Sequence, residues 1–150
     1  MSKQQISQAA ADVSAPTGRA LPLRTAALVA GDAVSFLVFS AVGRDSHNEA
    51  TGFGALGAVI GTALPFALGW FVVSPFLGAF RRPATSTPAK MLRRTELAWL
   101  CAWPVAMLAR LAIDAHHQIP MPFPIIVLAF NALFLGLWRG AFALLESRRA

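Results

Sequence analysis

The stretch that decides the fold is TAALVAGDAVSFLVFSAVG, residues 25–43, which is apolar except for one carboxylate, that of Asp32. Its length approaches the roughly 20 residues that an α-helix needs to cross the hydrocarbon core of a bilayer. A carboxylate inside such a span is costly unless it is protonated, paired or in contact with water. We therefore expect Asp32 to have a partner. The candidate is Arg139, which lies inside the last apolar stretch of the chain.

The composition indicates an integral membrane protein. Of the 150 residues, 56% are hydrophobic and only 13% are charged, and the mean hydropathy is +0.57. A soluble domain carries about 25% charged residues. The apolar residues also form long runs, without the short periods of an ordinary soluble core. The lipid bilayer is therefore the expected partner. The single cysteine, Cys101, excludes an intrachain disulfide and a cysteine-based metal site.

Four apolar runs predict an all-α bundle of four transmembrane helices. The expected spans are residues 25–43, 53–80, 95–113 and 122–145, between a disordered tail at 1–24 and a short tail at 146–150. The second span is longer than a crossing requires. It also contains Pro65 and Pro75, so we expect a kinked or tilted helix there.

The lysines and arginines predict the orientation. Most of them lie before the first span, between the second and third spans, or after the last span: Lys3, Arg19, Arg24, Arg81, Arg82, Lys90, Arg93, Arg94, Arg148 and Arg149. Only Arg44 and Arg110 lie near the other two connections. The positive-inside rule then places both termini in the cytoplasm, with the protein in the inner membrane of the cell. We interpret the net charge of +6 as topology and expect no nucleic-acid partner.

Asp32 and Arg139 should reach a similar depth from the cytoplasmic side. At 1.5 Å per residue, each lies about 12 Å or slightly more from the basic residues at its end of the span. Asn131 lies two turns deeper on the face of Arg139 and could extend a polar track. Three interpretations stay open: a structural ion pair, an Arg139 side chain that snorkels to the headgroups, and an ion or proton site.

Glycines at four-residue spacing indicate close helix–helix contacts, within the chain or between copies. In the second and last spans these are Gly57, Gly61, Gly69, Gly136 and Gly140. The tryptophans give a second indication of packing. Trp99 fits an interfacial belt near the cytoplasmic side, whereas Trp70 and Trp138 fall deeper in their spans.

A polar cluster is expected on the non-cytoplasmic side. Its members are Arg44, His47, Arg110, Asp114 and His116. Histidines with carboxylates can bind zinc, but these spacings match no established metal motif, so we expect no metal and no cofactor. The spans also contain no paired nucleophile and base and no phosphate-binding loop.

Several short motifs resemble one family of bacterial membrane proteins. They are Gly31-Asp32, Gly43-Arg44 with His47, Pro65-Phe66 with Gly69-Trp70, Pro75 with Gly78, and Trp138-Arg139. Together they resemble the family called domain of unknown function 3054, over about residues 23–139. The resemblance implies four spans and puts Asp32, Arg44 and Arg139 in motif positions. It implies no activity, because the family has none established.

The sequence leaves three functional hypotheses. The first is a non-enzymatic integral membrane protein that associates with copies of itself through its small-residue helix faces. The second is a small transporter or channel subunit, in which Asp32 would bind a proton or ion and Arg139 would be its charge partner. The third is a membrane enzyme that uses the histidines of the outer face.

Overall fold

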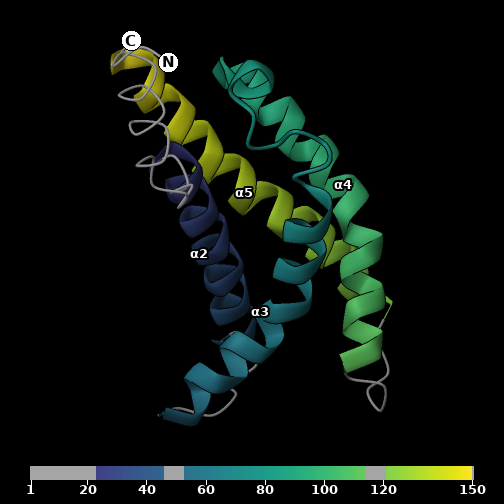
Figure 1. Ribbon diagram of the computed structural model, residues 1–150. Coiled ribbons are helices and arrows are strands. Elements are labelled where there is room, and N and C mark those ends of the chain that lie inside the picture. Colours follow the sequence, from purple (N-terminus) through teal and green to yellow (C-terminus); the bar gives the residue numbers. More distant parts are fainter. Residues whose placement is uncertain (1–22, 46–52, 114–120, 150) are drawn as a thin grey trace, which may run out of the picture.

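The computed structural model describes residues 23–45, 53–113 and 121–149, and these residues are mainly helical, with no strand among them. All four long helices are apolar enough to cross a membrane. The expected all-α fold with four candidate spans is therefore confirmed. The elements are α2 (Leu23–Asp45), α3 (Phe53–Val73), the 3-10 helix η1 (Arg82–Thr85), α4 (Pro88–Ile113) and α5 (Pro122–Arg149) (Figure 1).

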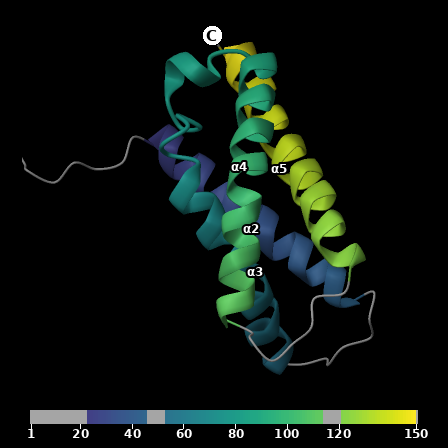
Figure 2. The ribbon, with the colours of Figure 1, turned by 90° about the vertical axis from the view of Figure 1, so that its right-hand side faces the viewer.

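Each long helix packs against two others. Helix α3 lies between α2 and α4, and α5 also contacts both α2 and α4. The start of α2, the start of α4 and the end of α5 lie at one end of the bundle, shown at the top of Figures 1 and 2. Because the number of candidate spans is even, a chain that crosses the membrane with each of them begins and ends on the same side. We refer to this end of the bundle as the basic end, because Arg81, Arg82, Lys90, Arg93 and Arg94 lie there.

Helix α3 ends at Val73 and does not continue to Phe80, the expected end of the second span. The residue before a proline is disfavoured in the helical conformation, which stops the helix at Ser74 before Pro75. Residues 74–80 form successive turns instead, and the Ala79 N–H donates to the Ser74 carbonyl at 3.1 Å. Gly78 supports this reversal with a φ of 71°, in the left-handed region that glycine tolerates. Pro65 is accommodated inside α3.

Helix α4 begins at Pro88, well before the expected apolar start near residue 95. Proline suits the first helical position because it has no N–H to leave unpaired. The preceding Thr87 caps the helix, since its Oγ1 accepts the Lys90 N–H at 3.3 Å. Helix α5 likewise runs past the expected end at residue 145 and reaches Arg149. The apolar runs thus predict the part of each helix suited to lipid, whereas the helices extend into polar sequence.

An aromatic cluster fills the centre of the bundle. Trp99 is 1% exposed, and its ring centroid lies 5.7 Å from that of Phe36 and 6.5 Å from that of Trp70. Its indole N–H donates to the Leu128 carbonyl at 3.0 Å. The expectation that Trp99 belongs to an interfacial belt is therefore wrong. Its face of α4 is turned toward the other helices, and the indole N–H finds a backbone acceptor there.

The glycines of α3 lie on different surfaces of the helix, one packed against α4 and the others open. A Cβ atom built on Gly69 would lie 2.7 Å from the backbone nitrogen of Ala106, so α3 and α4 touch backbone to backbone there. Atoms built on Gly57 and Gly61 would meet nothing within 4 Å. Glycine stripes in lipid permit such close approach of backbones. Among the glycines of α3, Gly69 is therefore the one that packs against another described helix.

We predict that Gly69→Ala lowers the free energy of unfolding by about 1–3 kcal/mol, because the added methyl group must push α4 away. The matched control is Gly61→Ala, which adds the same methyl group to the same helix at an open position. Unfolding in detergent, followed by circular dichroism, measures both. Equal stability of the two variants would contradict the close α3–α4 contact.

Candidate functional site

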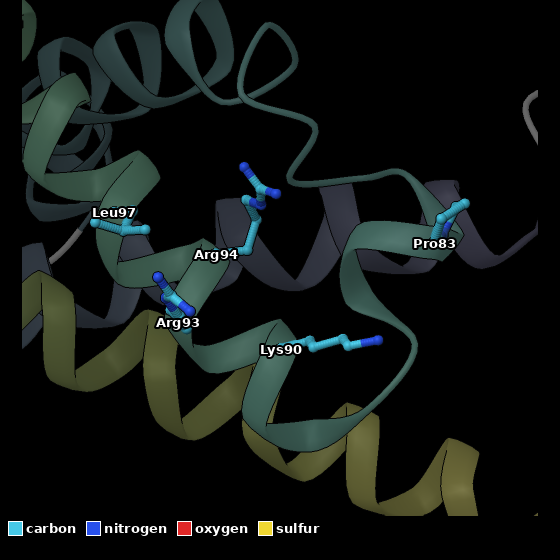
Figure 3. A pocket seen from close by; sticks show the side chains of 5 residues that line it. All are labelled: Pro83, Lys90, Arg93, Arg94 and Leu97. Carbon is cyan, nitrogen blue, oxygen red and sulfur yellow. The ribbon is translucent and has the colours of Figure 1, made fainter.

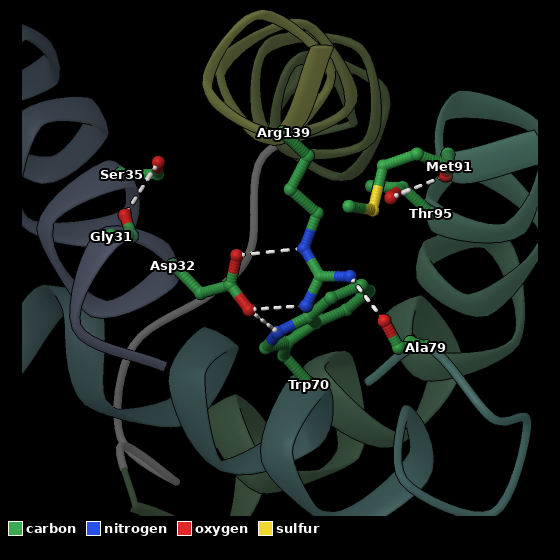
Figure 4. Close-up of polar contacts among 8 residues, drawn as sticks. All are labelled: Gly31, Asp32, Ser35, Trp70, Ala79, Met91, Thr95 and Arg139. Carbon is green, nitrogen blue, oxygen red and sulfur yellow. Dashed lines mark hydrogen bonds and ion pairs between the residues drawn. The ribbon is translucent and has the colours of Figure 1, made fainter. Parts of the chain in front are cut away.

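Asp32 and Arg139 form a buried ion pair between α2 and α5. The Arg139 Nε donates to Asp32 Oδ1 at 2.8 Å, and the Arg139 Nη2 donates to Asp32 Oδ2 at 2.6 Å. Both side chains are 0% exposed. This two-pronged arrangement, seen in Figure 4, is the geometry in which a guanidinium and a carboxylate attract most strongly. The structure thus brings together the two charges that the sequence pairs.

Two further segments complete the surroundings of the pair. From α3, the Trp70 indole N–H donates to Asp32 Oδ2 at 3.0 Å. From the turn that follows α3, the Ala79 carbonyl accepts a hydrogen bond from Arg139 Nη1 at 2.7 Å. The guanidinium carbon lies 5.0 Å from the ring centroid of Trp70 and 4.8 Å from that of Phe80. Aromatic faces attract a cation, the more so where water is excluded. The pair therefore ties α2, α3, the turn at 74–80 and α5 together.

The approach of α2 to α5 depends on the residues that precede the two charges. A Cβ atom built on Gly31 would overlap the Trp138 ring. Only a glycine therefore leaves room for that ring against the backbone of α2. Gly31 accommodates Trp138 in the same crossing where Asp32 binds Arg139. The dipeptides Gly31-Asp32 and Trp138-Arg139 act as one contact.

The turn after α3 supplies the Ala79 carbonyl. The Ser74 N–H donates to the Trp70 carbonyl at 2.8 Å. The start of the turn is therefore hydrogen-bonded to Trp70, the residue whose indole binds Asp32. Gly78 in its left-handed conformation then reverses the chain. As a result the Ala79 carbonyl faces the guanidinium (Figure 4). A backbone acceptor at this place replaces water for one arginine N–H.

The surroundings favour an architectural role for the pair. The carboxylate and the guanidinium neutralise each other. If the two groups separated, each charge would lie in a dry interior without a counterion. The snorkelling interpretation of Arg139 is wrong, because its guanidinium is fully buried against Asp32 and does not reach the helix ends. The remaining interpretations concern whether the pair also moves a proton or an ion.

A second charged contact closes the basic end. The Arg24 Nε donates to Glu146 Oε1 at 2.7 Å, and the Arg24 Nη2 donates to Glu146 Oε2 and to Thr85 Oγ1, both at 3.0 Å. This contact joins the start of α2, η1 and the end of α5. In the sequence, Arg24 indicates only the orientation of the first span, and its contact with Glu146 is not predicted.

Asn131 lies on the same helix as Arg139, but it does not extend the hydrogen bonds of the ion pair in the described residues. Its Nδ2 donates to the Val127 carbonyl at 3.0 Å. Its Oδ1 is buried and has no partner among the residues that the structure describes. Asn131 is therefore a separate buried polar group, about two helical turns from Arg139.

The expected outer cluster falls mostly outside the described residues. His47, Asp114 and His116 lie in the ranges 46–52 and 114–120, which the structure does not describe. Arg44 and Arg110 are described, are half-buried, and both take part in interactions. The cluster stays a prediction.

Glu96 is a carboxylate that the sequence analysis did not single out. It lines an apolar groove between α4 and α5 together with Leu92, Gly136 and Gly140. A Cβ atom built on Gly136 would lie 2.9 Å from Glu96 Oε1, and one built on Gly140 would lie 3.4 Å from Leu92. These two glycines therefore make room for α4 side chains. Their predicted role in helix packing applies to the α4–α5 contact.

Comparison with family models assigns most of the chain to a family. Residues 29–142 match the family described as "Protein of unknown function (DUF3054)". The chain belongs to the DUF3054 family. Comparison with curated proteins and with solved structures found no match. In this DUF3054 protein the matched range contains Asp32, Trp70 and Arg139, whereas Arg24 and Glu146 lie outside it.

For this DUF3054 protein we predict that Asp32→Asn and Arg139→Gln each lower the free energy of unfolding by about 3–5 kcal/mol. Each change leaves one charge buried without its counterion. The double variant should be more stable than the sum of the two losses predicts, because neither charge remains. Unfolding in detergent for all four proteins gives the coupling. Strictly additive losses would contradict a direct ion pair.

Proposed function

We propose that this DUF3054 protein is a non-enzymatic integral membrane protein that associates with copies of itself through the outer face of α3. The observation that carries the proposal is the open space over Gly57 and Gly61. Atoms added there would meet nothing within 4 Å, although Gly69 of the same helix is packed against α4. A small-residue face that none of the described helices covers is available to a second copy.

The residues around these glycines suit a contact in lipid. Gly57 and Gly61 are four residues apart, the spacing at which two transmembrane helices can cross with their backbones close together. The neighbouring side chains are apolar and open to the outside: Leu56 is 63% exposed, Ile60 48% and Leu64 46%. These side chains can pack beside a partner helix. Figures 1 and 2 show the start of α3 at the end of the bundle opposite the start of α4.

We place the basic end in the cytoplasm of a bacterial cell, with the protein in the inner membrane. The support is the distribution of basic residues, since the connection between α3 and α4 carries Arg81 and Arg82 and the first turns of α4 add Lys90, Arg93 and Arg94. Short connections rich in lysine and arginine stay on the cytoplasmic side. Both termini would then be cytoplasmic.

We assign the Asp32–Arg139 pair to architecture and not to transport. A transport site must release its ion or proton and exchange partners during each cycle. Asp32 is held by three hydrogen bonds, from Arg139 and Trp70, and Arg139 is further held by the Ala79 carbonyl. Separation of these groups would leave two buried charges without a counterion. The contacts therefore favour a fixed role.

We predict that Gly57→Leu combined with Gly61→Leu lowers self-association about ten-fold or more, a change of roughly 1.4 kcal/mol or more. The two leucines would hold a partner backbone away from α3. The measurement is the dimer fraction in lipid vesicles, counted by single-molecule photobleaching at several protein densities.

The control is Ala30→Leu, which enlarges a small exposed residue on α2. It should leave the dimer fraction unchanged. A wild-type protein that stays monomeric at every density, or a double variant that dimerises like the wild type, would reject self-association through α3. Thermal unfolding of the same samples separates this result from a loss of fold.

A further inference from the structure

A pocket at the basic end is lined by three cationic residues, a proline and a leucine. Its volume is about 390 Å³, and its lining residues are Pro83, Lys90, Arg93, Arg94 and Leu97. It lies between η1 and the first turns of α4, and Figure 3 shows the three cationic side chains extending from that helix. No carboxylate lines it. The pocket therefore concentrates positive charge.

These cations have no counterion among the residues that the structure describes. Asp32 is engaged by Arg139, and Glu146 by Arg24. Glu96 lines the separate groove between α4 and α5. Like charges four residues apart on a helix repel, so Lys90 and Arg94 destabilise the start of α4 while they face each other alone. An anion bound between them would remove that cost.

Two backbone N–H groups at the start of α4 already have acceptors and are not available to such an anion. The Lys90 N–H is taken by Thr87 Oγ1 at 3.3 Å, and the Met91 N–H by the Thr87 carbonyl at 2.8 Å. Binding would therefore depend on the side chains of Lys90, Arg93 and Arg94. Guanidinium groups suit phosphate oxygens because their N–H groups match the oxygens in pairs.

The same face of α4 continues as an apolar surface. Leu97 lies one turn beyond Arg93 and Arg94, and at helical spacing Leu108 lies on the same side. Leu97 is 47% exposed and Leu108 66% exposed. A charged pocket thus leads directly into a leucine-rich face of a helix that is apolar enough to span the membrane. This order of chemistry matches a phospholipid, whose phosphate headgroup continues into acyl chains.

We propose that this pocket binds the phosphate headgroup of an anionic phospholipid, with an acyl chain along the face of α4 that begins at Leu97. A basic pocket beside a transmembrane helix is a site at which anionic headgroups bind. The lipid supplies a counterion that the described residues do not provide, and it holds η1 and α4 at the membrane surface.

The test uses the full chain, purified in detergent and stripped of lipid, with native mass spectrometry as the readout. The added ligands are phosphatidylglycerol, phosphatidylcholine and inorganic phosphate, each alone. We expect phosphatidylglycerol to bind about ten-fold more tightly than phosphatidylcholine, in keeping with attraction to several basic residues. Binding of phosphatidylcholine equal to that of phosphatidylglycerol would overturn the proposal.

Variants locate the site. Lys90→Gln with Arg93→Gln and Arg94→Gln should abolish the preference for phosphatidylglycerol. The control, Arg81→Gln with Arg82→Gln and Arg148→Gln, removes the same charge from residues outside the pocket lining and should keep the preference. An equal loss in both variants would indicate general charge attraction and overturn the pocket.

The apolar part of the site distinguishes a lipid from a free anion. Leu97→Asn should weaken phosphatidylglycerol several-fold and leave inorganic phosphate unchanged. Inorganic phosphate that binds as tightly as phosphatidylglycerol, with no effect of Leu97→Asn on either, would assign the pocket to a soluble anion and reject the lipid. Because the outer face of α3 contributes no residue to this pocket, failure of self-association would leave this result unaffected.

Discussion

The structure depends on one carboxylate that cannot stand alone in a dry interior. Asp32 is buried at the crossing of α2 and α5, and it is stable there as an ion because Arg139 meets it with two hydrogen bonds. A charge near the centre of a membrane costs several kcal/mol unless it is paired, with estimates that begin at about 2.5. The requirement to satisfy both charges fixes which helices touch, at what depth and in which rotation. Trp70 adds a donor from α3, so three helices share the constraint.

The connection between α3 and α4 takes part in the same set of contacts around the ion pair. Because α3 stops at Val73, the chain has room to reverse inside the bundle and to present the Ala79 carbonyl to Arg139. The following residues reach the basic end, where Thr85 meets Arg24. The interior pair and the closing contact at the basic end are thus linked through a single short segment. The faces left open, along α3 at Gly57 and beside α4 at Lys90, are those for which we propose partners: a second copy and a lipid.

The sequence predicted the ion pair because both charges interrupt long apolar runs at similar distances from their basic flanks. It also predicted four helices, since apolar runs of this length have few other solutions. It did not predict the turn at residues 74–80, because an apolar composition continues there and only Pro75 and Gly78 mark the break. The Ala79 contact uses a backbone carbonyl, which has no residue-type signal. The helical face that Trp99 or Gly57 presents depends on how neighbouring helices rotate, and spacing alone leaves that rotation undetermined.

The most direct test of the central claim is a distance between the two charged groups in a lipid bilayer. In protein that carries isotope labels at the aspartate carboxyl carbons and the arginine guanidinium nitrogens, rotational-echo double-resonance solid-state NMR detects such pairs. The Asp32 carboxyl signal is identified as the one that is missing in Asp32→Asn. The ion pair predicts strong dephasing of this signal in the wild-type protein and loss of that dephasing in Arg139→Gln. An Asp32 signal that shows no dephasing in the wild-type protein, or that keeps its dephasing in Arg139→Gln, would contradict the account.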